Sequence, residues 1–255
     1  MITKQFHSQV YGADLVYEKK SRLRKTKKII RILKDAFGPQ IKKAKLLDVG
    51  CAEGIISSYL SPYFRYVVGV DVDRVAIRRA SKHKKKNLSF KLLKPDGSFP
   101  FGDNSFDIIV ANQIYEHAEN PKLLMDEIYR VLKQDGICFL GAGNRLVIRD
   151  AHYPNLPFVS WLPIWLADFY VRWTKSGEYY EPRLRTIIGI KKLMGNFIVE
   201  DFTLKVIRSP FRYYVDDLIK KNSFVFKIPG FALRILYPMI PNYLFVLRKQ
   251  RSHRR

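Results

Sequence analysis

The chain has 255 residues, of which 47% are hydrophobic and 14% aromatic, so it can bury a substantial core and is not expected to be disordered. Its 46 Lys and Arg residues against 23 Asp and Glu residues give a formal charge of +23, which favours phosphate-rich partners such as nucleic acid, anionic lipid or phosphorylated substrates. Two separated cysteines, Cys51 and Cys138, exclude a disulfide-rich scaffold and indicate a cytoplasmic setting.

The N-terminal part of the chain is strongly basic. Its first residues carry charge throughout and lack the apolar centre of a secretory signal, so no export is predicted. Residues 19–45 hold twelve Lys and Arg residues around an apolar stripe, which indicates an amphipathic helix ending at Gly38-Pro39. Two further basic runs, residues 82–86 and 248–255, are interpreted as solvated surface and a frayed tail. The stripe consists of Leu23, Ile29, Ile30, Leu33 and Phe37.

From Lys45 onward, short apolar runs alternate with segments of helical periodicity. This alternation predicts an open α/β sheet of parallel strands covered by helices. No apolar segment reaches the length of about 20 residues that spans a bilayer, so no transmembrane helix is predicted. The expected strands are 45–49, 66–70, 88–93, 106–111 and 137–140, with a last one at 243–247, and the expected helices are 55–60, 73–85 and 121–132.

The first strand runs into a loop with Gly50 and Gly54, which let the backbone pass close to a ligand. A dinucleotide-binding loop would read G-x-G-x-x-G, but Ile55 stands where the last glycine would be, which excludes a dinucleotide oxidoreductase. After the second strand, Asp71 is expected to accept hydrogen bonds from both hydroxyls of a ribose. The alternative role for Asp71 is to cap the next helix, for which Asp73 is placed at least as well.

The motifs in this region resemble those of class I S-adenosylmethionine-dependent methyltransferases. They are D-V-G-C-A-E-G from Asp48, G-V-D-V-D from Gly69, P-D-G-S-F-P-F-G-D-N-S-F-D from Pro95, and the run from Ala111 to Gly136 that begins A-N-Q-I-Y-E-H. The branch that they resemble contains the ubiquinone- and menaquinone-pathway methyltransferases. The resemblance implies a Rossmann-like, mostly parallel sheet of seven strands with helices on both faces and S-adenosyl-L-methionine as the cofactor, with no metal.

The same resemblance assigns cofactor-binding roles by position. Asp48, Gly50 and Gly54, with the backbone of Cys51 and Ala52, would line the methionine end. Ala52 replaces a commoner glycine, which is interpreted as tolerated variation. The ribose, the adenine and the methyl donor would be contacted by Asp71, Val72, Asp96, Gly97, Asn112 and Gln113.

His117 follows the fourth expected strand and is the candidate general base for an acceptor that must lose a proton. The alternative is that Glu116-His117 only caps or orients the following helix. Methyl transfer depends mainly on alignment of donor and acceptor, so the fold prediction does not depend on this role.

Two aromatic-rich insertions, residues 144–185 and 207–241, interrupt the expected pattern after the fifth strand and before the last. Loops between late strands commonly build substrate pockets, so the candidate pocket residues are His152, Tyr153, Trp161 and Trp165. A helix is expected from Pro163, apolar on most sides, which would form a lid or contact lipid headgroups. Core packing is favoured over membrane contact for both insertions.

The chain is therefore expected to be a single methyltransferase domain, with a basic helical cap at 1–44 and a cofactor-binding core at 45–143. The leading function is O-methylation of a small-molecule, sugar or lipid-linked acceptor. RNA methylation using the basic surface, or cofactor binding without catalysis, are the alternatives. Peripheral contact with an anionic membrane surface at the inner face is a further expectation, nucleic acid is less favoured, and no protein partner is indicated.

Overall fold

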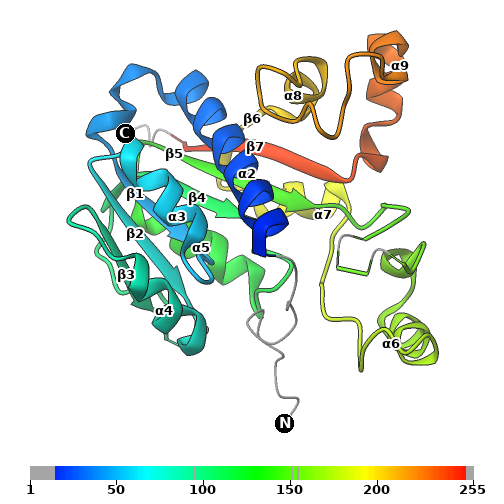
Figure 1. Cartoon of the computed structure of the whole chain (residues 1–255), viewed down its shortest axis with the longest axis horizontal. Coiled ribbons are helices and arrows are strands. Elements are labelled where there is room, and N and C mark those ends of the chain that lie inside the picture. The colour runs from blue at the N-terminus through cyan, green and yellow to red at the C-terminus, as the bar shows by residue number, and fades with distance from the viewer. Residues whose placement is uncertain (1–14, 95, 151, 154, 251–255) are drawn as a thin grey trace, which may run out of the picture.

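The computed structural model describes residues 15–94, 96–150, 152–153 and 155–250 and contains one seven-stranded sheet (Figure 1). The strand order is β3-β2-β1-β4-β5-β7-β6, and β7 alone is antiparallel to its neighbours. This confirms the predicted Rossmann-like sheet. The strands are β1 Lys45–Val49, β2 Tyr66–Asp71, β3 Leu88–Leu92, β4 Phe106–Asn112, β5 Leu132–Gly143, β6 Phe197–Asp201 and β7 Asn242–Lys249.

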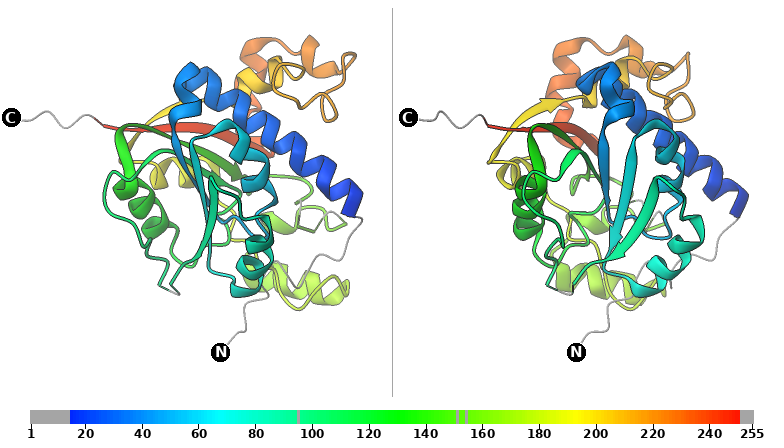
Figure 2. Two further views of the ribbon diagram at one scale, coloured as in Figure 1. Left: turned by 60° about the vertical axis from the view of Figure 1, so that its left-hand side comes forward. Right: turned by 90° about the vertical axis from the view of Figure 1, so that its left-hand side faces the viewer.

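Helices cover both faces of the sheet, as expected for strands that are apolar on both sides (Figure 2). Helices α2 (Leu15–Phe37) and α3 (Ile55–Leu60) pack on one face, and α5 (Pro121–Val131) and α7 (Ile187–Leu193) pack on the other. The shorter helices α4 (Arg74–Ala80) and α8 (Thr203–Arg208) follow β2 and β6. Two apolar layers, one on each side of the sheet, therefore hold the scaffold.

The basic helix predicted after residue 19 is α2, and it lies against the sheet. Ile29 and Leu33 are fully buried, and the helix ends at Gly38, whose φ of 84° is left-handed. Arg24 forms an ion pair with Asp216 at 3.2 Å. Asp35 likewise pairs with Arg212 at 3.0 Å, so α2 is also tied to the second insertion. The predicted cap residues 1–14 and tail residues 251–255 lie outside the described residues.

Three elements differ from the sequence prediction. Helix α4 ends at Ala80 and continues only as a short 3-10 turn, because the like charges of residues 82–86 disfavour a longer helix. Strand β5 begins at Leu132, five residues earlier than predicted, because Leu132 pairs with Phe106 before an irregularity in the register, after which pairing resumes at Ile137. Strand β6 was not located from the sequence because only Phe197 is buried, which leaves no alternating pattern.

The two insertions fold onto the edge of the sheet where β4 and β5 end. Helix α6 (Ile164–Trp173) follows β5, and α9 (Gly230–Ile235) precedes β7, whose first residue pairs with the last residue of β5. Figure 1 shows both helices on the side toward which β4 and β5 point.

Helix α6 is only partly packed. Ala167 and Val171 are buried in a small core of their own, but Trp165 and Trp173 are 70% and 72% exposed. The expectation of core packing is therefore wrong for these two tryptophans, because the segment forms a separate lobe too small to cover both faces of its helix. Within the described residues, no helix is long and apolar enough to cross a membrane.

Candidate functional site

The loop after β1 follows a path that needs its two glycines. Gly50 and Gly54 have φ values of 72° and 75°, in the left-handed region. A Cβ atom on Gly50 would lie 2.4 Å from the side chain of Ile114, and one on Gly54 would lie 2.6 Å from the ring of Phe90. The two glycines therefore leave room for the side chains of Ile114 and Phe90. The sequence analysis had explained them only by the close approach of a ligand.

Ala52 lies between these glycines and is itself left-handed, with φ of 45°. This conformation costs a residue with a Cβ atom about 1–2 kcal/mol, so the replacement of glycine is less neutral than the sequence indicated. The backbone N–H of Ala52 donates to Oδ2 of Asp71 at 2.8 Å. That bond connects the loop to the end of β2 and offsets part of the strain.

Asp71 lies at the carboxyl end of β2 with both carboxylate oxygens engaged by backbone. Oδ2 accepts from Ala52, and Oδ1 accepts from the N–H of Asp73 at 2.9 Å. Burial raises the pKa of Asp71 above its ordinary value. Asp73 caps α4 by accepting from Val75 and Ala76, which confirms the predicted cap. Val72 contributes a further backbone hydrogen bond, so the carboxylate, which has about four acceptor positions, keeps capacity to accept from a ligand hydroxyl.

Asp48 and Cys51 lie beneath the loop. Asp48 is only 4% exposed and accepts a hydrogen bond from the Ser57 hydroxyl at 2.5 Å, so it fixes α3 to β1. Burial raises the pKa of Asp48 to about 7, despite the Ser57 hydrogen bond and with a further contribution from Asp71. Cys51 is 5% exposed, and burial raises the pKa of its thiol. Both side chains are therefore buried under the loop and are not exposed at its surface.

The remaining predicted cofactor residues lie at the ends of neighbouring strands. Asp96 accepts from the backbone N–H and the hydroxyl of Ser98, and Gly97 has open space around it. The backbone N–H of Gln113 donates to the Gly141 carbonyl at 2.8 Å. A Cβ atom on Gly141 would lie 2.4 Å from Oδ1 of Asn112, so this glycine of β5 makes room for the polar end of β4.

Sheet topology brings most of the residues predicted to bind the cofactor to the ends of β1, β2 and β4, which are called the cofactor edge below. Val49 of β1 is in register with Val70 of β2 and Ala111 of β4, so the three strands end together. Chain order reverses between β1 and β4, which is the point where open α/β sheets bind ligands. Val72, next to Asp71, is 44% exposed at this edge.

A second group of polar side chains lies where β4 and β5 end. Nδ1 of His117 is 3.3 Å from Oε1 of Glu181, and Nδ1 of His152 is 2.8 Å from Oδ1 of Asp150. The two imidazole rings meet edge to face, with centroids 5.0 Å apart. Glu116 is fully buried, and its two carboxylate oxygens have no hydrogen-bond partner among the described residues. These five residues are called the imidazole cluster below.

The sequence analysis found only two members of the imidazole cluster. It missed Glu116 as a buried acid, and it missed Asp150 and Glu181 entirely. Asp150 could have been noticed two residues before His152 in R-D-A-H-Y. Glu181 lies 64 residues from His117, and no local signal connects the two.

The other candidate pocket residues are more scattered. Tyr153 packs its ring 5.4 Å from that of Tyr180, beside the imidazole cluster, and its hydroxyl donates to the Tyr179 carbonyl. Trp161 donates to the carbonyl of Val147 and is 40% exposed. Trp165 lies on the exposed side of α6, with 70% of its surface open to solvent.

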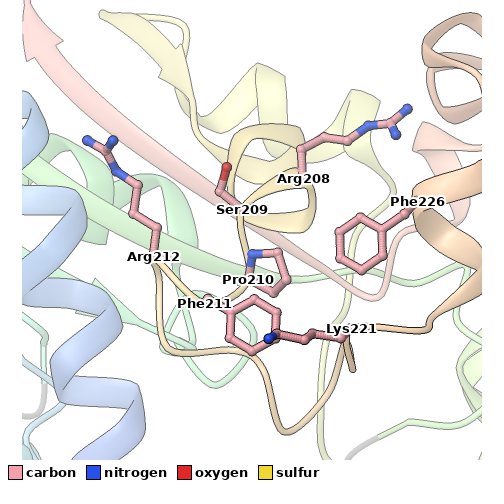
Figure 3. A pocket seen from close by; sticks show the side chains of 7 residues that line it. All are labelled: Arg208, Ser209, Pro210, Phe211, Arg212, Lys221 and Phe226. Carbon is pink, nitrogen blue, oxygen red and sulfur yellow. The ribbon is translucent and has the colours of Figure 1, made fainter.

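A surface hollow in the second insertion is lined by residues 208–212, Lys221 and Phe226 (Figure 3). Figure 3 shows the guanidinium groups of Arg208 and Arg212 directed away from it. Arg212 pairs with Asp35, and Arg208 donates to the carbonyl of Ile228. The hollow therefore offers mainly aromatic surface, and it shares no residue with the cofactor edge or the imidazole cluster.

Comparison with known proteins adds the following. A family profile described as "Methyltransferase domain" matches residues 47–140. The chain is 30% identical over 190 residues to the ubiquinone biosynthesis O-methyltransferase of Pelagibacter ubique, an alignment that covers 71% of this chain and 76% of that protein. It is 27% identical over 204 residues to the protein of the same name from Rickettsia bellii, covering 76% and 82% of the two chains.

Among solved structures, the plantazolicin methyltransferase BpumL, determined with a desmethyl substrate analogue and SAH, is similar in fold. Its TM-score is 0.56 at 16% identity, covering 91% of this chain and 85% of that one. At this identity the likeness concerns the fold alone.

Proposed function

This chain belongs to the family of S-adenosylmethionine-dependent methyltransferases, and on that premise we propose that it methylates a hydroxyl oxygen of a small-molecule or lipid-linked acceptor. The ring hydroxyl of a quinone precursor is the first candidate, because the relatives are named for O-methylation in ubiquinone biosynthesis. The observation that carries the proposal is the juxtaposition of two sites. Gln113 of the cofactor edge and Glu116 of the imidazole cluster lie side by side, since a Cβ atom on Gly143 would lie 3.3 Å from Oε1 of Gln113 and 3.4 Å from Oε1 of Glu116.

The residues present fit S-adenosylmethionine. Asp71 retains capacity to accept from a ribose hydroxyl, and among the described residues no arginine forms an ion pair with it that would select a phosphorylated ribose. Asp71 ends β2 beside the glycine loop, and its carboxylate suits a ligand that carries a positive sulfonium and an ammonium group, whereas Asp48 of β1 is buried beneath the loop and acts by bonding Ser57. Gly97 and Val72 leave space and apolar surface where the adenine would lie.

The bound cofactor supplies an electrophilic methyl group, and this chain supplies alignment. Gln113 is held in a left-handed conformation, with φ of 56°, by the hydrogen bond from its backbone to β5. Its side chain donates a hydrogen bond to Asn242 at 3.2 Å, which fixes the side chain of Gln113 beside the position proposed for the methyl group. Such fixed geometry is the main contribution that a protein makes to an in-line displacement.

We also propose that the acceptor is reached at an anionic membrane surface. Three aromatic side chains on α6, Trp165, Phe169 and Trp173, are 56–72% exposed, and on α9 Phe231 and Ile235 are 69% and 72% exposed. Both helices lie on the side toward which β4 and β5 point (Figure 1). Exposed aromatic residues on a protein with a charge of +23 are suited to an interface of lipid tails and anionic headgroups.

The test of the proposed function combines binding and turnover. Calorimetry should detect S-adenosylmethionine binding to the wild type and loss of at least about tenfold in affinity in Asp71→Ala, because two charge-assisted hydrogen bonds are removed. Asp135→Asn, an exposed acid in β5, is the matched control and should bind as the wild type does.

Turnover is followed by mass spectrometry, as a gain of one methyl group in lipid, sugar or quinone-precursor fractions. Methylation of RNA that is retained in a salt-sensitive way would favour the RNA alternative instead. Absence of cofactor binding by the wild type would refute the methyltransferase assignment for this chain.

A further inference from the structure

The imidazole cluster contains two histidines in different electrostatic settings. Both come from segments that follow the ends of β4 and β5, and each faces a carboxylate through Nδ1. Their rings are in contact, so one acceptor molecule could reach either. Only an uncharged imidazole with an accessible lone pair can accept a proton. The hydrogen bonds of each ring therefore decide which of them can act as a base.

His152 is held by a buried carboxylate. Asp150 is 3% exposed, and its Oδ1 also accepts from the backbone N–H of His152 at 3.0 Å, while its Oδ2 accepts from the hydroxyl of Tyr180. Burial alone would raise the pKa of Asp150, but the hydrogen bond from His152 and the others around it hold the pKa below its ordinary value. Asp150 is thus an acceptor only, so Nδ1 of His152 must carry the proton and Nε2 must hold the lone pair.

His117 also faces a carboxylate, but a more exposed one. Burial lowers its pKa, but the hydrogen bond to Glu181 and the charges of Glu116 and Glu181 outweigh this and leave the pKa raised. Its Nδ1 lies 3.3 Å from a Glu181 side chain that is 41% exposed, a longer and wetter contact than that of His152. The ring of His117 is therefore held less firmly than that of His152, whose carboxylate partner is buried and is itself fixed by Tyr180. The sequence-based assignment of the base to His117 is therefore not the one that the geometry favours.

We propose that His152 is the general base that removes the proton from the acceptor hydroxyl, with Asp150 and Tyr180 as positioning residues that fix its tautomer. The assignment rests on the proposed function. The acceptor O–H bond breaks toward Nε2 of His152, and the oxygen forms its bond to the methyl carbon as the carbon–sulfur bond breaks and sulfur keeps the electron pair. The resulting imidazolium returns its proton to water.

Glu116 completes the arrangement. Its carboxyl group is buried and has no hydrogen-bond partner among the described residues, and burial raises its pKa above the ordinary value although the charges of His117 and His152 oppose the shift. A negative charge on Glu116 would stabilise the imidazolium that forms on His152. Glu116 thus acts on the two rings through space, and it has no exposed surface with which to touch the acceptor.

The experiment compares two acceptors of different acidity, catechol and 4-nitrocatechol, in the variants His152→Gln, His117→Gln and His83→Gln. His83 is exposed in the 3-10 turn after α4 and serves as the matched surface control. We expect His152→Gln to lower kcat on catechol by about 100-fold or more, and by less than about tenfold on 4-nitrocatechol, whose hydroxyl is already largely ionised at neutral pH. S-adenosylmethionine affinity should stay within about twofold of the wild type, which distinguishes lost base catalysis from a damaged fold.

Asp150→Asn provides a second measurement. Nitrogen NMR of labelled histidine should show Nδ1-protonated His152 in the wild type and a change of tautomer in this variant. Equal losses on both acceptors in His152→Gln, an acceptor-dependent loss in His117→Gln, or an Nε2-protonated His152 in the wild type would each overturn the assignment. Failure of the proposed function would differ: the wild type itself would not bind S-adenosylmethionine or would methylate neither phenol.

Discussion

Replacing Asp48 with asparagine should remove a defined part of the pH dependence of stability. Asp48 is buried beneath the glycine loop, and its pKa rises from 3.8 to about 7, mainly through burial. Because the folded-state pKa lies above the unfolded one, the folded protein keeps a proton that the unfolded chain loses as pH rises above about 4. Raising the pH therefore lowers the free energy of unfolding until about pH 7, above which this contribution is constant.

The size of the effect follows from the shift. Each pKa unit corresponds to about 1.4 kcal/mol, so between pH 5 and pH 8 the contribution of Asp48 should fall by about 2.5 kcal/mol. Asp48→Asn is close in shape to the protonated acid and cannot ionise, so it should lack this slope. Urea unfolding of the wild type and Asp48→Asn across this pH range gives the difference in their free energies of unfolding. Groups that titrate alike in the two proteins cancel from this difference.

Ser57→Ala is the companion variant. The hydroxyl of Ser57 donates to Oδ2 of Asp48 and lowers its pKa, so removing it should raise the pKa further and shift the loss of stability toward higher pH. Parallel unfolding curves for the wild type and Asp48→Asn from pH 5 to pH 8 would refute this account of the buried acid.

Two further predictions concern the loop and the surface of α6. Gly54→Ala should lower the free energy of unfolding by about 2–4 kcal/mol, because its Cβ would lie 2.6 Å from Phe90 at a φ of 75°. Thermal unfolding of Gly97→Ala, which has the same backbone strain but open space, is the control and should show only about 1–2 kcal/mol. Trp165→Ser with Trp173→Ser should reduce sedimentation with anionic vesicles several-fold and leave thermal stability nearly unchanged, because both rings are already exposed.

The outcomes that would contradict these two predictions are distinct. Equal destabilisation by Gly54→Ala and Gly97→Ala would mean that strain, and not the contact with Phe90, dominates. For the vesicle experiment, Ile188→Ser on α7 is the control, since Ile188 is 67% exposed on a different helix. Unchanged vesicle binding by the double tryptophan variant, or an equal loss in Ile188→Ser, would refute the membrane-facing role of α6.

The convergence of the residues at the cofactor edge could be predicted from the sequence, because each of them lies at or just after the end of a strand that the apolar pattern marks. Gly50 and Gly54 follow one apolar strand, Asp71 ends the next, and Asn112 ends the one that pairs on the other side. Parallel strands end at a common edge, so residues at strand ends converge whatever the details of packing. The sequence did not show which side chains of the protein these residues pack against, such as the ring of Phe90 beside Gly54.

The imidazole cluster could not be predicted because its members are joined only by the path of the chain. Tyr180 is 30 residues from Asp150, and Glu181 is 64 residues from His117. The returning segment at 181–185 is held by Tyr115, whose hydroxyl accepts the backbone N–H of Arg185, and by a bond from Arg183 to the Glu116 carbonyl. No periodicity encodes those contacts.

Hydrophobic periodicity thus determined most of the sheet and its helices, since burial along a strand or helix follows the spacing of apolar residues, and it placed the residues predicted to bind the cofactor at neighbouring strand ends. Tertiary structure alone decided which carboxylate each histidine meets: His152 meets the buried Asp150, and His117 meets the more exposed Glu181. It also decided that Trp165 and Trp173 face outward, because the insertion folds as a lobe that has no second layer to cover them.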